Sequence, residues 1–376
     1  MKILYTNFHD CHGGGHTTYV LALARALGGR HRVHVAAPPG SRLLAGAEGL
    51  EGVSAVPQPF PNGIRRLAAR RRARASLRAL LREERFDLVH VNGSADHRLV
   101  LSALRGLPVR PRIVFTKHNS KPASGVGAWW RARRGTDHVI AVCDDTRKRL
   151  LDTPYGRLPM DAVPNGVDLE RYRPWPDDAR CQARRQWLGA GGDDVLLLGS
   201  NAGTIAYKGW MDLVEALALL PEVQRARVSV LLAGEPPADD ALARIEALEL
   251  GGQVRFAGLL DDIRPMVAAL DAGFVLSWDV ETISFACREM MAMGKPVLVS
   301  DYAGLPENIE PGVDGWVVPA RSPPRVADAI LQLLDARDRL PAMGAAARAH
   351  AERAFGIERF VDATEAVYYR AVAAGA

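Results

Sequence analysis

The sequence predicts an α/β protein made of two doubly wound units, each with a parallel sheet covered by helices. Short segments rich in Val and Ile alternate with longer amphipathic segments along the whole chain. Strands separated by helices in this way pair in parallel. Prolines cluster between Pro164 and Pro176 and mark a boundary, and the halves differ in charge. Residues 1–175 carry 29 Lys and Arg against 14 Asp and Glu, and the remaining residues carry 19 against 29.

The expected strands are short and end before a loop or a helix start. In the first half they are Lys2–Phe8, Arg32–Ala37, Asp87–Asn92, Arg112–His118 and His138–Cys143. In the second half they are Asp194–Ser200, Arg227–Gly234, Val254–Gly258, Ala272–Trp278, Pro296–Ser300 and Trp316–Pro319. Helical periodicity is clearest in Trp210–Leu220, Pro236–Leu250, Pro323–Leu334 and Ile357–Ala373. Ligands of such folds bind at the carboxyl ends of the strands, so we expect the functional residues there.

Composition excludes several classes of protein. The chain has 376 residues, of which 48% are hydrophobic and 24% charged, as in ordinary globular proteins. No apolar run approaches the ~18–20 residues of a membrane span, and the first residues resemble a β-strand more than a signal peptide. The four cysteines form no Cys-x-x-Cys pair, which argues against a zinc site or a disulfide framework. We therefore expect a cytoplasmic protein.

Two carboxylates flank an expected helix start in the second half. The segment Glu281-Thr-Ile-Ser-Phe-Ala-Cys-Arg-Glu289 places them eight positions apart, with Ser284 as a candidate N-cap between them. Backbone N–H groups at a helix start suit a phosphate, and carboxylates suit hydroxyl groups. The pattern therefore points to a nucleotide-sugar, although an isolated pair of glutamates is more often a solvated helix face.

Three further segments carry candidate functional residues. Gly13-Gly14-Gly15 opens a helix after the first expected strand, where a ligand could approach the backbone closely. Thr116-Lys117-His118-Asn119 ends the Arg112–His118 strand, and Lys208-Gly209 follows the first strand of the second half. Each segment taken alone also has a purely structural interpretation.

Together these segments resemble the retaining glycosyltransferases of family 4, which have the two-domain GT-B fold. The likeness rests on the Glu–seven residues–Glu signature, the Ala-Met-x-Gly-x-Pro-Val element after it, Leu305-Pro306-Glu307 and the Val163–Pro174 connector. It implies two Rossmann-like domains facing each other across a cleft. The expected limits are 1–170 for an acceptor-binding domain, 171–355 for a nucleotide-sugar-binding domain and 356–376 for a helix that crosses back to the first domain.

The resemblance also implies roles for individual residues. Glu281 would bind hydroxyls of the transferred sugar, Lys208 would neutralise the leaving diphosphate, and His118 would contact the donor sugar or phosphate. The other implied donor-binding residues are Glu289 at the ribose, Ser284, Phe285, Gly14, Gly15, Ser200 and Val254 near the base. The implied acceptor-binding residues are His16, Asn119 and His97.

The chain departs from the family pattern at two of these positions. Ser200 stands where relatives carry an arginine, and Asn119 replaces an aspartate. The loss of the arginine leaves most of the positive charge at the diphosphate to Lys208. No Asp-x-Asp element of metal-dependent relatives is present. We therefore expect neither a cofactor nor an essential metal ion.

A strongly basic segment precedes the third expected strand. Residues Arg65–Arg85 contain nine arginines against two acidic residues, with Leu and Ala at helical spacing. Such a helix fits an anionic membrane surface or a phosphorylated acceptor lipid, and a solvated helix face is the alternative. The membrane reading suggests an enzyme peripheral to the inner face of a bacterial membrane, in lipopolysaccharide or surface-polysaccharide synthesis.

Two other functions remain open at this point. A sugar-nucleotide epimerase shares the same architecture, and a nucleic-acid-binding protein would account for the pI near 9.1. The nucleic-acid alternative does not explain the paired glutamates or the acidic second half, so we expect no nucleic-acid partner. A nicotinamide dehydrogenase is disfavoured because no G-x-G-x-x-G element follows a strand.

Overall fold

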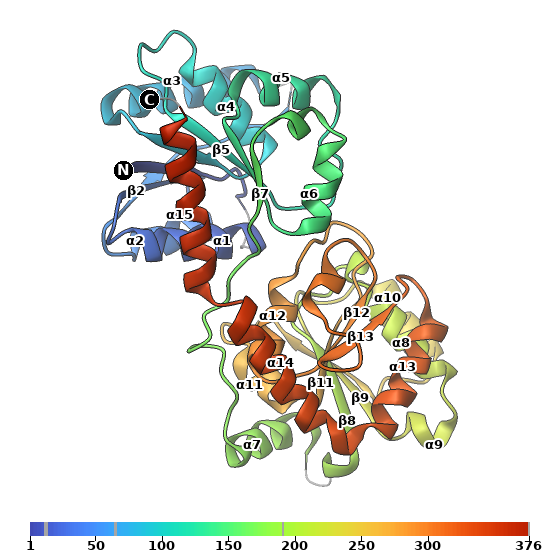
Figure 1. The fold of residues 1–376 in the computed structure, drawn as a ribbon. Helices are drawn as coiled ribbons and strands as arrows, with labels where there is room; N and C mark the ends of the chain where they lie inside the picture. The colour runs from blue at the N-terminus through green and yellow to red at the C-terminus, as the bar shows by residue number, and fades with distance from the viewer. Residues whose placement is uncertain (11–13, 64–65, 190–191, 375–376) are drawn as a thin grey trace. The chain divides into compact units, whose positions relative to one another are not determined.

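The chain forms two compact units in the structure, which is a computed structural model describing residues 1–10, 14–63, 66–189 and 192–374 (Figure 1). Unit 1 comprises Met1–Asn165 and Glu358–Ala376, and unit 2 comprises Gly166–Ile357. The first division falls inside the Val163–Pro174 connector, and the second falls at the start of the last helix. The last helix therefore belongs to the unit built mainly from the first half of the chain.

Unit 1 is built on a seven-stranded parallel sheet with the order β3-β2-β1-β4-β5-β6-β7. Its strands are β1 (Lys2–Thr6), β2 (Arg32–Ala37), β3 (Val53–Pro57), β4 (Leu88–Val91), β5 (Arg112–Lys117), β6 (His138–Ala141) and β7 (Met160–Ala162). Its helices are α1 (Gly15–Leu27), α2 (Arg42–Glu48), α3 (Leu67–Glu84), α4 (Ser94–Leu104), α5 (Gly125–Gly135), α6 (Asp144–Leu151), the 3-10 turn η1 (Pro154–Arg157) and α15 (Ile357–Ala373). The order reverses between β1 and β4, which makes the carboxyl ends of these strands a switch point.

Helices cover both faces of the unit 1 sheet. Apolar residues of α3, α4 and α5 share one core with alternate residues of the central strands, and these helices lie together on one face in Figure 1. On the other face the hydroxyl of Tyr368 in α15 donates to Tyr5 of β1 at 3.0 Å and lies 2.6 Å from Nδ1 of His90 in β4. Helix α15 is thereby fixed to the sheet of unit 1.

Unit 2 is built on a six-stranded parallel sheet with the order β10-β9-β8-β11-β12-β13. Its strands are β8 (Leu196–Ser200), β9 (Val228–Ala233), β10 (Val254–Gly258), β11 (Ala272–Val275), β12 (Val297–Ser300) and β13 (Gly315–Val318). Its α-helices are α7 (Asp177–Leu188), α8 (Trp210–Leu219), α9 (Glu222–Arg225), α10 (Asp239–Ala247), α11 (Arg264–Ala269), α12 (Phe285–Ala292), α13 (Pro323–Asp335) and α14 (Leu340–Ala354). Short 3-10 turns complete it, namely η2 (Gly192–Asp194), η3 (Ala206–Lys208), η4 (Leu305–Asn308) and η5 (Arg337–Arg339).

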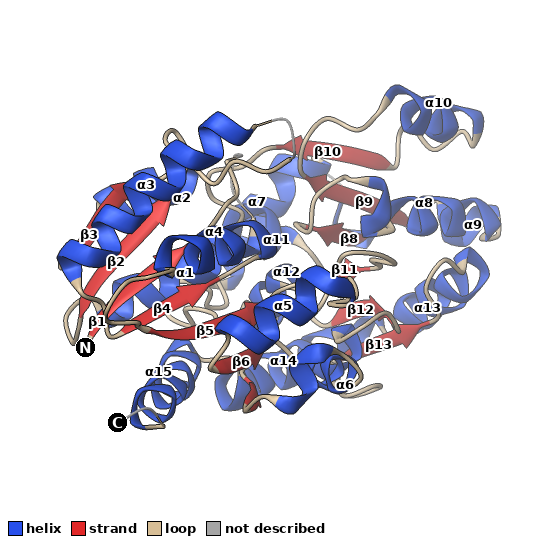
Figure 2. Cartoon of the chain, turned by 90° about the horizontal axis from the view of Figure 1, so that it is seen from above, coloured by secondary structure: helices blue, strands red, loops and turns tan. Residues whose placement is uncertain are grey.

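Two hydrophobic cores hold the helices of unit 2 on the two faces of its sheet. Helices α8, α10 and α13 contribute to one core, and α8 and α13 lie side by side in Figure 2. Helices α7, α11, α12 and α14 contribute to the other core. Almost every residue of the central strands is buried, as expected for a parallel sheet covered on both faces.

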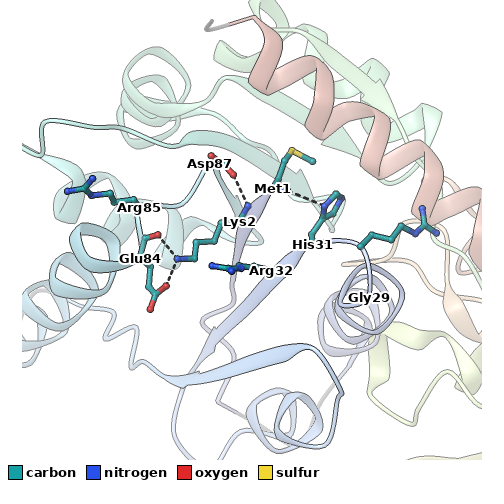
Figure 3. A pocket seen from close by; sticks show the side chains of 9 residues that line it. Met1, Lys2, Gly29, His31, Arg32, Glu84, Arg85 and Asp87 are labelled. Carbon is teal, nitrogen blue, oxygen red and sulfur yellow. Dashed lines mark hydrogen bonds and ion pairs between the residues drawn. The ribbon is translucent and has the colours of Figure 1, made fainter.

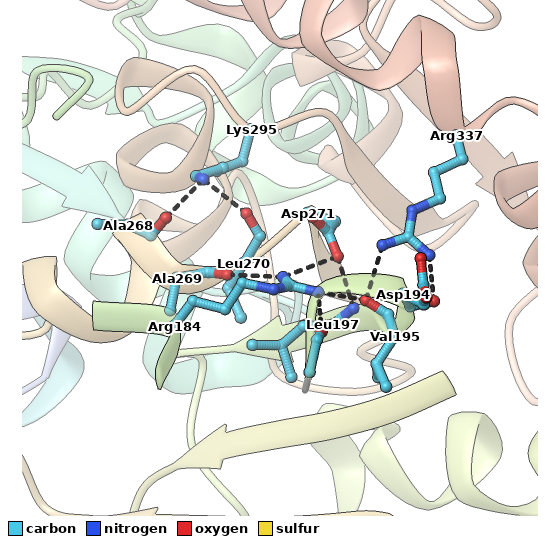
Figure 4. Close-up of polar contacts among 11 residues, drawn as sticks. Arg184, Asp194, Val195, Leu197, Ala268, Ala269, Leu270, Asp271, Lys295 and Arg337 are labelled. Carbon is cyan, nitrogen blue, oxygen red and sulfur yellow. Dashed lines mark hydrogen bonds and ion pairs between the residues drawn. The ribbon is translucent and has the colours of Figure 1, made fainter. Parts of the chain in front are cut away.

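Buried charges fasten helix α11 to the amino end of this sheet (Figure 4). Lys295 Nζ donates to the carbonyls of Ala268 and Leu270 at 2.8 and 2.6 Å, and Arg184 forms an ion pair of 3.0 Å with Asp271. Burial lowers the pKa of Lys295 to about 7. The Gly-Lys-Pro element at residues 294–296 therefore acts through packing and carbonyl capping in unit 2.

The six strands expected in the second half are all present, whereas two strands of the first half were missed. Strand β3 is at one edge of the sheet and β7, with only three residues, is at the other. Both are half-exposed, so neither shows the continuous apolar pattern of a buried strand. Strand β5 is therefore the fifth strand of the sheet and not the fourth.

Candidate functional site

The carboxyl ends of β8 and β11 in unit 2 hold Lys208 and Glu281 against each other. Lys208 Nζ lies 2.7 Å from Glu281 Oε2, and the two side chains are only 18% and 10% exposed. The Ser277 hydroxyl donates to the same carboxylate at 3.3 Å, and the Thr282 backbone N–H donates at 3.1 Å. The cation and the carboxylate that are predicted to bind different parts of the donor are thus bonded to each other in the structure.

The backbone between η3 and α8 fixes the position of Lys208. Gly209 has a φ of 70° and approaches the Leu276 carbonyl so closely that a Cβ atom would clash with it. The Trp278 N–H donates to the Tyr207 carbonyl at 2.9 Å and ties the Lys208 turn to the loop after β11. The Lys-Gly pair is therefore a geometric requirement of this turn.

Ser284 begins α12 with a φ of 49°, an uncommon value for a residue with a side chain. Its hydroxyl accepts a hydrogen bond of 3.4 Å from the Cys287 N–H, so Ser284 is the N-cap that the sequence predicted. Val280, just before Glu281, also has a positive φ. Residues with positive φ therefore lie on both sides of Glu281. Such strained backbone is concentrated at functional sites, which makes this loop a candidate for one. Phe285 is the first residue of the helix and is half-buried.

Glu289 lies on the second turn of α12 and is held by two residues that sequence reasoning did not identify. Asn201, directly after β8, donates its side-chain N–H to Glu289 at 2.7 Å, and the Tyr172 hydroxyl also bonds to this carboxylate. Burial raises the pKa of Glu289 above its usual range, and these hydrogen bonds oppose the shift. Tyr172 belongs to the Val163–Pro174 connector.

Ser200 and Val254 occupy different parts of the unit 2 sheet. Ser200 ends β8 at the carboxyl edge and accepts a hydrogen bond of 3.3 Å from the Ala202 N–H. Val254 is the first residue of the edge strand β10 and pairs with Val230 of β9, and its side chain is buried in the core. Contact of the backbone around Val254 with the base of the donor stays a prediction.

Another cation lies near the Lys208 turn, in the unit where Ser200 stands in place of the family arginine. Arg321, after β13, lies at the same edge of the sheet and stacks on Trp278 at 5.0 Å from the ring centroid. Trp278 is bonded through its backbone to the residue before Lys208. Arg321 is therefore a second cation in this part of unit 2.

In unit 1, His118 directly follows β5 and lies in a stack of aromatic rings. Its ring centroid is 4.2 Å from that of His16 and 4.5 Å from that of Tyr19, which meets it edge-on. The centroid of the His16 ring also lies 4.5 Å from that of the His9 ring. Burial lowers the pKa of His118 well below its usual range and that of His16 to about 3. Both rings are consequently neutral at physiological pH.

Asn92, the residue after β4, determines which ring nitrogen of His118 carries hydrogen. The Asn92 side-chain N–H₂ donates to the carbonyls of Thr6 and His90 at 3.0 and 3.4 Å, so its Oδ1 is an acceptor. His118 Nε2 lies 2.8 Å from this oxygen and must donate to it. Because a neutral imidazole has a single N–H, Nδ1 of His118 can only accept a hydrogen bond.

Asp96 fixes the position of Asn92 through hydrogen bonds to its carboxylate. Its carboxylate accepts hydrogen bonds from the Asn92 backbone N–H at 2.8 Å and from the Thr6 hydroxyl at 2.9 Å. The side chain is fully buried, which raises the pKa of Asp96 to about 7. Sequence reasoning missed Asn92 and Asp96 as functional candidates.

The structure corrects the expectation for His97. This residue is on α4, is fully buried, and lies 3.1 Å through Nε2 from the Gly135 carbonyl. Its ring packs on Phe115 in the core, so it cannot reach an acceptor. Asn119 is half-exposed, and its backbone carbonyl and side-chain oxygen both accept hydrogen bonds from Lys117.

The glycine-rich segment at the start of α1 is described only in part. Gly13 lies outside the described residues. Gly14 has a φ of 146° and is the N-cap of α1, with Gly15 as the first helical residue. A Cβ atom on Gly14 would meet nothing within 4 Å, so there is open space beside this backbone.

A hollow of about 520 Å³ lies at the amino end of the unit 1 sheet, away from His118 (Figure 3). In its wall, Lys2 Nζ lies 2.6 Å from Glu84, and the Lys2 backbone N–H donates to Asp87 at 2.7 Å. Within the described ranges, no three or more His, Cys, Asp or Glu side chains are placed to hold a metal ion. None of the described helices is long and apolar enough to span a membrane.

The two parallel-sheet units have the architecture of the GT-B class. Similar solved structures include Anabaena HepE in complex with UDP and glucose, with a TM-score of 0.83, 20% identity and coverage of 97% of this chain and 98% of that chain. Sucrose-phosphate synthase from Thermosynechococcus elongatus has a TM-score of 0.82 and 19% identity, and the whole of both chains is covered.

The family follows from sequence comparison. Residues 13–171 match the model of Glycosyltransferase Family 4, and residues 193–336 match Glycosyl transferases group 1. The chain belongs to this family of glycosyltransferases. A GDP-mannose-dependent alpha-(1-6)-phosphatidylinositol monomannoside mannosyltransferase from Mycobacterium tuberculosis is 32% identical over 222 residues, which are 57% of each chain. This match spans little more than half the length of the relative. Phosphatidyl-myo-inositol mannosyltransferase from Mycobacterium leprae is 28% identical over 89% of this chain and 88% of its own.

Proposed function

We propose that this protein is a retaining, metal-independent glycosyltransferase that moves a sugar from a nucleoside-diphosphate-sugar to a hydroxyl of a glycan or lipid-linked acceptor. The observation that carries the proposal is the Lys208–Glu281 pair beside the start of α12, with Glu289 on the next turn. This arrangement offers a cation and backbone N–H groups for a diphosphate and carboxylates for hydroxyl groups.

The reaction breaks the bond between the anomeric carbon and the diphosphate and forms a bond from the same carbon to the acceptor oxygen. Lys208 neutralises the departing diphosphate, and the N–H groups at the start of α12 assist it. Glu281 accepts hydrogen bonds from hydroxyls of the transferred sugar, and Glu289 accepts them from the ribose. The acceptor proton passes to the leaving diphosphate on the same face, which gives retention without a protein nucleophile.

We also propose a role for His118, which directly follows β5 of unit 1. As the family resemblance implies, His118 would contact the donor sugar or phosphate. Gly14, Gly15, His16 and Asn119 are proposed to lie near the substrates.

The proposed acceptor is a membrane glycan or glycolipid, as in lipopolysaccharide or surface-polysaccharide synthesis. The mannosyltransferase relatives act, by their names, on phosphatidylinositol and its monomannoside, so these lipids are the acceptors to assay first. Contact of Arg65–Arg85 with an anionic membrane surface would bring a cytoplasmic enzyme to such a substrate. Arg65, the first residue of this basic segment, lies outside the described residues. We propose no nucleic-acid partner.

A panel of nucleoside-diphosphate-sugars with and without acceptor tests the proposal. Acceptor-dependent release of nucleoside diphosphate in the presence of EDTA is expected. Conversion of the donor without an acceptor would instead indicate a sugar-nucleotide epimerase. Strong salt-sensitive binding to random duplex DNA, without turnover of any donor, would support the nucleic-acid alternative.

A further inference from the structure

A groove between α3 and α4 gathers four arginine side chains. Arg70, Arg71 and Arg74 come from α3 and Arg98 from α4, and the groove has a volume of about 320 Å³. Its wall also includes Asn62, but neither Asp nor Glu is among the described residues that line it. Four positive charges therefore share one concavity without a carboxylate.

Two of the four arginines are held in place by the protein. Arg74 Nε donates to the Ser102 carbonyl at 2.9 Å, and Arg98 donates to the Ser94 carbonyl at 3.1 Å and to Asn62 Oδ1 at 2.7 Å. All these acceptors are uncharged. The two guanidinium groups are thus positioned by the fold while their charges stay uncompensated.

The guanidinium groups of Arg70 and Arg71 differ from those of Arg74 and Arg98 in their hydrogen bonding. Across the part of the chain that the structure describes, neither forms a hydrogen bond or an ion pair. By contrast, Arg78 on the same helix donates to the carbonyls of Ala103 and Arg105 at the end of α4. Arg78 thus serves the fold, whereas Arg70 and Arg71 remain available to a ligand.

Electrostatic repulsion within the groove favours an anion. The pKa of Arg98 is lowered first by partial burial and then by the positive charges of Arg131 and Arg70. An anion with several oxygens removes this repulsion and accepts bonds from several planar guanidinium groups at once, which is how arginine binds phosphate.

One exposed apolar side chain lies beside these arginines in the groove. Leu67, at the start of α3, lines the groove and is 58% exposed. An exposed leucine beside a cationic pocket fits a phosphate attached to an apolar body. We propose that the α3–α4 groove binds the phosphate of an anionic phospholipid headgroup. This proposal rests on the proposed membrane contact and gives it a specific site.

Vesicle co-sedimentation with a matched control variant tests the site. Arg70→Gln/Arg71→Gln removes two charges inside the groove, and Arg72→Gln/Arg82→Gln removes two charges of the same helix outside it. With phosphatidylglycerol-containing vesicles, the groove variant should lose at least tenfold more affinity than the control. Thermal unfolding should be unchanged in both variants, because none of these four side chains forms an intramolecular hydrogen bond or ion pair within the residues that the structure describes.

Other outcomes of the vesicle assay distinguish failure of the groove proposal from failure of the proposed glycosyltransferase function. Equal losses in both variants would overturn the groove as a site and leave only diffuse attraction. Absence of binding to any vesicle would overturn the membrane contact itself, while acceptor-dependent sugar transfer would still be measurable. Binding of inorganic phosphate that is lost in the groove variant, together with equal vesicle affinities of the groove and control variants, would assign the groove to a free anion and overturn the lipid headgroup.

Discussion

Replacing Lys208 with Met should separate the structural and chemical roles of its pair with Glu281. At 2.7 Å and an effective dielectric constant of about 20, the attraction is about 6 kcal/mol, much of which offsets desolvation. Among the described residues, the variant leaves Glu281 with the Ser277 hydroxyl and the Thr282 N–H as hydrogen-bond donors. We expect a loss of about 3 kcal/mol in the free energy of unfolding, as for one partner removed from a buried pair.

The effect on catalysis should be larger than the effect on donor binding. Loss of one group that stabilises developing charge lowers turnover by about 10²–10³, so kcat should fall more than the KM for the donor rises. Stopped assays of nucleoside-diphosphate release and urea unfolding measure the two effects. A variant with wild-type kcat would refute the role of Lys208 at the diphosphate.

A second variant keeps this test independent of folding. Lys208→Met/Glu281→Gln removes both charges and should recover most of the lost stability, because no unpaired carboxylate remains. Its turnover should stay as low as that of the single variant or lower. Recovery of turnover together with stability would show that the pair is only structural.

Three other substitutions give separate tests. Glu289→Ala should weaken binding of nucleoside diphosphate by about 1.5–3 kcal/mol in calorimetry, the worth of hydrogen bonds to a charged group, and unchanged affinity would remove its ribose role. Asn92→Asp should raise the pKa of His118, and ¹⁵N NMR of the wild type should show the Nε2–H tautomer; an Nδ1–H tautomer would contradict the hydrogen-bond assignment. The raised pKa of Asp96 means that its contribution to stability is present at low pH and is lost as pH rises towards about 7, so Asp96→Asn should flatten the change in Tm between pH 4 and 7. An equally steep change in the variant would place the titration elsewhere.

The strand pattern could be predicted wherever strands are buried. The central strands β9, β8, β11 and β12 of unit 2 and β4 of unit 1 are fully buried and almost wholly apolar, whereas the edge strand β10 contains the exposed Arg255 and was predicted from its flanking turns. The edge strands β3 and β7 could not be predicted from the sequence, because both are partly exposed and lack a continuous apolar run that would distinguish them from loops. The N-cap at Ser284 was predictable because it depends on local chemistry alone.

The partners of the candidate residues could not be predicted in the same way. Asn201 and Tyr172 bond to Glu289 from 88 and 117 positions away, and only the fold brings them together. The burial of His97 likewise depends on α5 packing over α4. Sequence patterns therefore identified the reactive groups better than the hydrogen bonds that orient them.

The central claim is retaining transfer without a metal ion, and the anomeric configuration of the product tests it most directly. The protein would be incubated with an α-linked donor such as GDP-mannose and a phosphatidylinositol acceptor in EDTA, and the one-bond C1–H1 coupling of the product would be measured by NMR. Alternative donors would be assayed in the same way if GDP-mannose is not turned over. We predict an α-linked product, formed at the same rate with EDTA as with Mg²⁺. A β-linked product, or a reaction that requires Mg²⁺, would contradict the proposed roles of Lys208 and Glu281.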